Sequence, residues 1–239
     1  MNSELVIVNE PRSPISEIFR TLRTNIQFMS QSRTAHALLI TSTNTSEGKS
    51  WVSSNLALAI AQTGKKVIMI DGDMRKGRLH RIFGLNQKPG LSNYLSGVYD
   101  DEKGKILNGL EDYIQHTEID NLDVMSSGNI PPNPSELLIL PQMSELLMDL
   151  KERYDFVIID GTPCGLVTDS LILSRIVDSV VVIASCKETK KKDLQRVTEN
   201  IKNVGGKILG IILNKIEMSS KRYEKTYYYG STSSKSGSK

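Results

Sequence analysis

Short apolar runs alternate with amphipathic stretches along most of the chain. Continuous apolar runs, rich in β-branched residues, predict strands over residues 37–41, 66–70, 122–125, 156–159, 179–184 and 208–213. Helical spacing and capping residues predict helices over residues 13–29, 49–62, 79–83, 135–153, 168–176 and 190–203, and weaker ones over 91–95 and 103–110. Strands that alternate with helices indicate an α/β fold with a doubly wound, mostly parallel sheet and helices on both faces.

The ends of the chain lack this periodicity. Residues 1–12 are predicted to be a flexible lead-in, and Pro141 is expected to kink the helix that Ser135 caps. From Ser219 the sequence turns to Lys, Tyr, Ser, Thr and Gly without an apolar period, which is typical of disorder. We therefore expect one folded domain over residues 1–218 and a flexible tail over 219–239.

Composition bounds the kind of protein. The 239 residues carry a net charge of +3, and 38% are hydrophobic, which suits a water-soluble globular domain and is too weakly basic to predict nucleic-acid binding. Cys164 and Cys186 give no disulfide framework and are expected to be free, buried thiols of a reducing cytosol. Neither a signal peptide nor a membrane span is predicted, so membrane association would require a partner or surface charge.

The stretch that begins at Leu38 and ends at Ser50 predicts a strand, a polar loop and a helix start. That order makes a phosphate cradle, in which N–H groups and the helix dipole favour an anion and Lys49 reaches the phosphates. Ser50 would supply a hydroxyl to Mg²⁺. Thr43 stands where the full motif has glycine, so a solvated loop with a chance Gly-Lys-Ser is the alternative. The residues predicted to line a nucleotide are Thr43, Asn44, Thr45, Ser46, Glu47, Gly48, Lys49, Ser50 and Trp51.

Carboxylates follow two of the predicted strands. Asp71 and Asp73 follow one, two residues apart and so on one face, and Asp160 ends another. Because ligands of open α/β sheets bind at the carboxyl ends of strands, a Mg²⁺–nucleotide complex would make this cluster favourable. The alternative is that each Asp forms a turn or caps a helix. Asn214, at the end of the last strand, either contacts the nucleobase or simply ends the strand.

Taken together, these motifs resemble the bacterial tyrosine kinases of the capsular and exopolysaccharide type. These are P-loop proteins unrelated to eukaryotic protein kinases, whose H-R-D and D-F-G motifs are absent from this sequence. The resemblance covers nearly the whole chain. It rests on Glu17-x-x-Arg20-x-x-Arg23 and on residues 41–50, 70–76, 90–92, 131–138 and 159–163, followed by a C-terminal tyrosine cluster.

The resemblance implies ATP and Mg²⁺ as cofactors and a role for each site residue. Lys49 would hold the phosphates, and Asp71 is our choice for the base that accepts the tyrosine proton. Ser50, Asp73 and Asp160 would hold the metal, with Asp160 as the Walker-B acid. The catalytic set is thus Lys49, Asp71, Asp73 and Asp160.

The resemblance also implies partners. Glu17, Arg20 and Arg23 lie three apart on the helix over 13–29. Spacing alone favours a solvated charged row, whereas the family uses these positions to form a ring homo-oligomer. The phosphoacceptors would be Tyr223, Tyr227, Tyr228 and Tyr229 in the tail, modified in trans. A transmembrane activator of the polysaccharide export system would recruit this cytoplasmic kinase, which also acts on other protein tyrosines, to the inner face of the membrane.

The sequence departs from the family pattern at several positions. Thr45-Ser46 replace a usual Pro-Gly, so Ser46 would meet a steric penalty at positive φ. Gly77 replaces a usual proline, and Ser185 stands where arginine is common. Two other functions are therefore kept open: a partitioning or site-positioning ATPase, whose signature lysine would replace Asn44, and a ring scaffold that does not turn over ATP.

Overall fold

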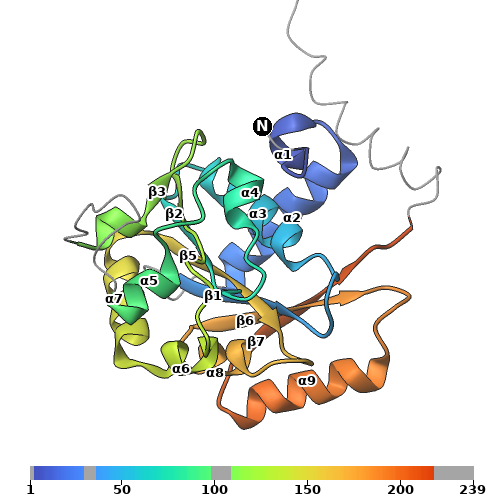
Figure 1. Ribbon diagram of the computed structural model, residues 1–239. Helices are drawn as coiled ribbons and strands as arrows, with labels where there is room; N and C mark the ends of the chain where they lie inside the picture. The colour runs from blue at the N-terminus through green and yellow to red at the C-terminus, as the bar shows by residue number, and fades with distance from the viewer. Residues whose placement is uncertain (1–2, 30–35, 98–108, 218–239) are drawn as a thin grey trace, which may run out of the picture.

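The computed structural model describes residues 3–29, 36–97 and 109–217 and is built around one central sheet (Figure 1). Within these residues the sheet has seven strands in the order β3-β4-β2-β5-β1-β6-β7. All neighbours pair in parallel except β3 and β4. The strands are β1 (His36–Ser42), β2 (Val67–Asp71), β3 (Gln115–His116), β4 (Leu122–Met125), β5 (Phe156–Pro163), β6 (Ser179–Ser185) and β7 (Ile208–Asn214). The predicted doubly wound α/β fold is confirmed.

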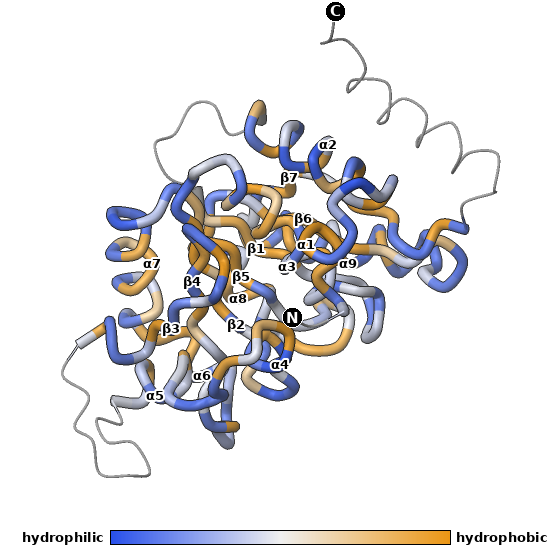
Figure 2. Tube along the Cα trace, turned by 90° about the horizontal axis from the view of Figure 1, so that it is seen from above, coloured by the Kyte–Doolittle hydropathy of each residue, from blue (hydrophilic) through white to orange (hydrophobic). Residues whose placement is uncertain are grey.

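Helices cover both faces of the sheet. One face carries α1 (Val6–Asn9), α2 (Pro14–Met29), α3 (Lys49–Ala61) and α4 (Leu79–Phe83). The other carries α5 (Leu91–Ser96), the 3₁₀ helix η1 (Leu110–Tyr113), α6 (Pro134–Ile139), α7 (Pro141–Arg153), α8 (Asp169–Ser174) and α9 (Lys191–Asn203). The central strands are largely hydrophobic, whereas α2 and α7 alternate between hydrophobic and hydrophilic residues (Figure 2). The continuous apolar runs of β2, β5 and β6 thus belong to strands that are buried on both faces, whereas β7, at the edge of the sheet, is partly exposed.

Two predictions about helices were wrong. Residues 1–12 are not a flexible lead-in throughout, because α1 buries Leu5 and Ile7 against the apolar layer that contains α3. The helix predicted over 135–153 is two helices, since Leu140 has an extended ψ of 144° before Pro141. A residue that precedes proline avoids the helical region, so Pro141 starts α7 rather than kinking one long helix. The weak helix over 103–110 falls mainly outside the described residues.

Helix α2 packs directly on α3. The rings of Phe19 and Trp51 meet edge to face with centroids 5.2 Å apart. Arg23 donates a hydrogen bond of 3.2 Å from Nη1 to the carbonyl of Ala59 in the last turn of α3. Among the described residues, no helix has the length and apolar character needed to cross a membrane.

Candidate active site

The loop between β1 and α3 is a tight turn over the carboxyl end of the sheet. Gly48 has a φ of 94°, in the left-handed region that favours glycine, and α3 begins at the next residue, Lys49. A Cβ at Gly48 would lie 2.2 Å from Nδ2 of Asn214, so the close approach of β7 also requires glycine there. Asn214 Nδ2 donates a hydrogen bond of 2.8 Å to the carbonyl of Glu47. Asn214, for which nucleobase contact and a simple strand end were both left open, thus supports the loop in this structure.

The backbone of Ser46 has a conformation that is costly for any residue other than glycine. Its φ is 60°, in the left-handed region. An L-residue pays about 1–2 kcal/mol for that conformation. The loop therefore keeps the backbone turn despite the substitution, and Ser46 bears the steric cost that the sequence predicts. Thr45 and Ser46 are both exposed, so no packing of their side chains explains the choice of residue.

Glu47 holds the loop together from the inside. Its side chain is buried and accepts hydrogen bonds from the N–H groups of Thr43 (2.8 Å) and Asn44 (3.0 Å). It also accepts from the side-chain amide of Asn44 and from the hydroxyl of Thr189, which follows β6. Sequence analysis placed Glu47 among the residues that line the nucleotide. Because its carboxylate is engaged within the protein and its carbonyl accepts from Asn214, Glu47 organises the loop, and the side chain does not face a ligand.

Asp71 ends β2 and stands opposite Asp160 in the register of β2 and β5; Asp160 does not end its strand as predicted, because β5 continues to Pro163. Both are buried. Burial raises the pKa of Asp160 to about 6, although the charge of Lys49 and hydrogen bonds from Ser50 and Ser53 favour ionisation. Burial, and next the negative charge of Asp160, raise the pKa of Asp71 well above its usual value. The structure thus brings together Lys49, Ser50 and the two carboxylates, as the sequence predicted.

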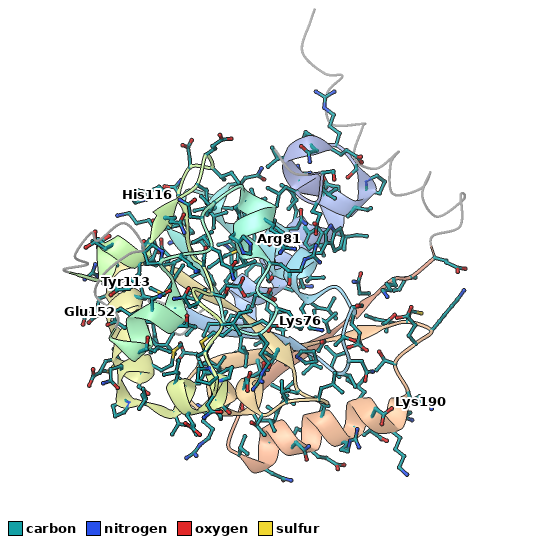
Figure 3. All side chains as sticks on the ribbon, viewed as in Figure 1. Lys76, Arg81, Tyr113, His116, Glu152 and Lys190 are labelled. Atoms are coloured by element: carbon teal, nitrogen blue, oxygen red, sulfur yellow. The ribbon has the colours of Figure 1, made fainter. Side chains whose placement is uncertain are left out.

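Asp73 lies two residues beyond the end of β2 and is only half-buried. Its carboxylate Oδ1 accepts hydrogen bonds from the N–H groups of Arg75 (3.2 Å) and Lys76 (2.9 Å). Its own N–H donates to Oδ1 of Asp71 over 3.3 Å, and Leu79 N–H donates to Oδ2 of Asp71 over 3.0 Å. Figure 3 labels Lys76 near the middle of the molecule, whereas Lys190, which precedes α9, lies at the periphery.

These residues fit a Mg²⁺ ion bound together with phosphates. Oδ1 of Asp160 is buried and has no hydrogen-bond partner in the described part of the chain, so an acceptor atom is left free there. The described residues hold no group of three or more His, Cys, Asp or Glu side chains that would cage a metal. Mg²⁺ commonly takes one or two carboxylates and completes its shell with phosphate and water. Asp160, Asp73 and the Ser50 hydroxyl suit that mode of binding.

Sequence reasoning missed two partners of this site. Asp169, the first residue of α8, accepts two hydrogen bonds from the guanidinium of Arg75. Thr189 joins Glu47 to the segment after β6, and its hydroxyl oxygen also accepts a hydrogen bond from the N–H of Ser185, the last residue of β6. Arg75 belongs to the motif over residues 70–76, but nothing in the sequence pairs it with Asp169.

The residues proposed for assembly lie apart from these carboxylates, on α2. Glu17 and Arg20 form an ion pair within the helix, and Arg20 Nη2 donates a 2.7 Å hydrogen bond to the carbonyl of Pro11. Arg23 bonds to Ala59, as described above, and its Nε is buried without a partner among the described residues. The predicted phosphoacceptors Tyr223, Tyr227, Tyr228 and Tyr229 lie outside the described residues.

Comparisons with known proteins agree with this architecture. A family model described as an AAA domain matches residues 38–215. The tyrosine-protein kinase YwqD of Bacillus subtilis is 37% identical over 230 residues, covering 96% of this chain and 92% of YwqD. The crystal structure of the chimerical protein CapA2B2 shares 39% identity at a TM-score of 0.82, over 91% of this chain and 92% of that one. The kinase domain of the Escherichia coli tyrosine kinase ETK shares 32% identity at a TM-score of 0.81, over 90% and 82%.

Proposed function

The chain belongs to the bacterial tyrosine kinases of capsule and exopolysaccharide systems, and on that premise we propose that it transfers the γ-phosphoryl group of ATP to tyrosine hydroxyls. One observation carries the proposal: two buried carboxylates, Asp71 and Asp160, face each other beside Lys49 and a left-handed phosphate loop. A buried acid pair is costly without a cation. Binding of Mg²⁺ together with phosphates at this site would offset that cost.

The loop over residues 43–48 binds the phosphates. Left-handed backbone at Ser46 and Gly48 produces the concave arrangement of N–H groups that favours anions, and the N-terminus of α3 adds its dipole. Lys49 places a cation at the same point. Glu47 fixes the loop before any ligand arrives, through its bonds to Thr43, Asn44 and Thr189. Binding then costs little reorganisation of the loop.

Asp71 accepts the proton of the attacking tyrosine hydroxyl. Its raised pKa suits a general base, since a carboxylate of ordinary pKa is a weak acceptor near neutral pH. The N–H groups of Leu79 and Asp73 fix the orientation of the Asp71 carboxylate. Mg²⁺, held by Asp160, Asp73 and Ser50, supplies charge neutralisation to the phosphates when bound.

The substrates and partners follow the same premise. The tail tyrosines Tyr223, Tyr227, Tyr228 and Tyr229 are phosphorylated in trans, within a ring that α2 assembles through Glu17, Arg20 and Arg23. A transmembrane activator of polysaccharide export recruits the chain to the inner face of the membrane. Each added phosphate brings about −1.5 to −2 charge to a Lys-rich segment, so modification would change how the tail binds its partners.

Intact mass measurement tests the proposal. The full chain is incubated with ATP and Mg²⁺, beside Lys49→Met and a variant with all four tail tyrosines changed to Phe. We expect stepwise phosphate addition that both variants lose. The same comparison is made on protein isolated from its own cells, where the activator is present, in case phosphorylation requires it. Wild type that matches Lys49→Met in both settings refutes the kinase. ATP hydrolysis without phosphotyrosine would point instead to an ATPase switch, and nucleotide binding without turnover to a scaffold.

A further inference from the structure

An ion pair between Arg75 and Asp169 joins residues 72–76, the segment that follows β2, to helix α8. Arg75 Nε lies 2.9 Å from Oδ2 of Asp169, and Nη2 lies 3.2 Å from Oδ1. The Asp169 side chain has no exposed surface, whereas that of Arg75 is 41% exposed. A buried carboxylate is stable only when it is well paired, and the two parallel bonds of a guanidinium fork fix geometry as well as charge. This pair therefore determines where the Arg75 side chain lies.

Arg75 is connected through the backbone to two of the three predicted catalytic carboxylates, Asp73 and Asp71. Its N–H and that of Lys76 donate to Oδ1 of Asp73. The N–H of Asp73 donates in turn to Oδ1 of Asp71. The contacts thus run without a break from Asp169 through Arg75 and Asp73 to Asp71.

The segment also lies tightly against the middle of β5 and against α8. The N–H of Gly72 donates a 2.9 Å hydrogen bond to the carbonyl of Asp160. A Cβ at Gly72 would lie 3.0 Å from Ile159, 3.2 Å from the Asp160 carbonyl and 3.3 Å from Leu173 of α8. Backbone contacts hold the start of the segment and Met74 is buried in the core, and at the far end the Arg75–Asp169 pair ties the segment to α8. Loss of the pair would therefore release the far end of the segment first.

We propose that Asp169 is a positioning residue for phosphoryl transfer, which acts through Arg75 to keep residues 72–76 in the conformation that orients Asp71 and Asp73. The inference rests on the kinase function proposed above. Arg75 is a positioning residue in the same sense, since its described polar contacts are to Asp169 and Asp73. The competing explanation is an ion pair that only stabilises the fold.

The test combines kinetics with hydrogen exchange. Asp169→Asn, Arg75→Ala and the double variant are compared with wild type for ATP affinity, kcat and exchange of the Arg75 and Lys76 amides. We expect kcat to fall about 10- to 100-fold, as for a displaced catalytic group, with ATP affinity within about threefold of wild type. Amide exchange should rise at least about tenfold. The double variant should be no worse than Arg75→Ala, because the two residues act as one unit.

A matched control separates positioning from stability. Lys151→Ala removes another ion pair, 2.8 Å long, to Asp178, whose side chain is 9% exposed and whose carboxylate bonds to Ala37 at the opposite edge of the sheet. That variant should leave kcat and the exchange of the Arg75 and Lys76 amides unchanged. Arg75→Lys, which keeps the charge without the fork, should recover kcat only in part.

The outcomes distinguish the two proposals. Wild-type kcat in both Asp169→Asn and Arg75→Ala, or protected Arg75 and Lys76 amides in both, overturns the positioning role. Faster exchange with unchanged kcat also overturns it. If wild type itself forms no phosphotyrosine, the kinase proposal fails, and the positioning role fails with it. The exchange data then still show whether the pair orders residues 72–76.

Discussion

Asp71 and Asp160 stand directly opposite each other on the adjacent parallel strands β2 and β5, and both side chains are buried. Burial is the main reason why the pKa of each carboxyl is raised, and the negative charge of Asp160 raises that of Asp71 further. Fold stability alone gives no reason to retain such a pair. The buried pair thus lowers the stability of the ligand-free protein, and this loss can be measured as a free energy of unfolding.

Replacing Asp160 by Asn should stabilise the ligand-free protein. Because the pKa of Asp160 is about 6 in the folded state and near 3.8 when unfolded, the unfolded chain binds fewer protons between these values. The folded state therefore loses stability as pH rises from about 4 to about 6. One pKa unit corresponds to about 1.4 kcal/mol, so Asp160→Asn should gain on the order of 2–3 kcal/mol at pH 7.5. Urea unfolding without metal or nucleotide measures this.

Asp155→Asn is the control for that experiment. Partial burial opposes ionisation of Asp155, but hydrogen bonds from Lys66 and Lys65 outweigh it and lower the pKa of that carboxyl. Its neutralisation should therefore destabilise the protein slightly, opposite in sign to Asp160→Asn. A loss of stability in the Asp160 variant at pH 7.5 would contradict the prediction.

Nucleotide binding with Mg²⁺ should weaken as pH falls through about 6. A metal ligand must be deprotonated, so the Asp160 proton competes with the ion. We expect affinity for ADP with Mg²⁺ to fall up to about tenfold per pH unit below that value. Calorimetry in buffers of different ionisation enthalpy measures the proton released. The same titration of Asp160→Asn reports the protons of the nucleotide itself, and equal proton release in the two proteins would rule out Asp160 as the linked group.

Ser46→Gly should raise the stability of the loop. Glycine removes the left-handed penalty of about 1–2 kcal/mol at φ 60°, and the greater freedom of the unfolded chain returns about 0.4–1 kcal/mol of that gain. The net gain of up to about 1.6 kcal/mol should appear as a higher melting temperature. Thr45→Gly, at the adjacent exposed residue without a positive φ, should lower it instead. Equal effects at the two positions would mean that Ser46 is not strained.

Much of this site could be predicted from sequence because parallel strands place their carboxyl ends together. Asp71 and Asp160 each follow an apolar run, and Lys49 follows the loop after β1, so the topology brings all three to one edge. The bonds that hold them could not be predicted. Glu47 meets Thr189 across 142 residues and Arg75 meets Asp169 across 94, and no local pattern encodes such pairs.

The two wrong predictions about helices have different causes: one depends on tertiary contacts, and the other on the effect of a single proline. Helix α1 is too short to show a period, and it forms because Leu5 and Ile7 are buried by tertiary packing. The second error concerns Pro141. Its restriction of Leu140 to extended backbone separates two helices, whereas the prediction was a kink within one helix.

Glu47→Gln should loosen the phosphate loop. An amide keeps one acceptor oxygen but cannot serve the N–H groups of Thr43 and Asn44 and the hydroxyl of Thr189 together. A buried donor left unpaired costs about 1–3 kcal/mol. We expect a stability loss of that size and a fall in ATP affinity of about tenfold or more. Glu188→Gln, an exposed residue paired with Lys215, is the control, and equal affinities in the two variants would deny Glu47 its role.

The charged row on α2 should control assembly more than folding. Glu17 and Arg20 form an ion pair within one helix, at a partly exposed site where such pairs contribute about 0–1 kcal/mol. If a second copy competes for these charges, Glu17→Ala/Arg20→Ala should shift the mass in multi-angle light scattering to a monomer with little change in melting temperature. Arg23→Ala should in addition lower stability by about 1 kcal/mol, because Arg23 bonds to the Ala59 carbonyl of α3. Lys65→Ala, which breaks an exposed pair with Asp155, should change neither the mass nor the assembly. A double variant that elutes with the mass of wild type would show that the row is a solvated face.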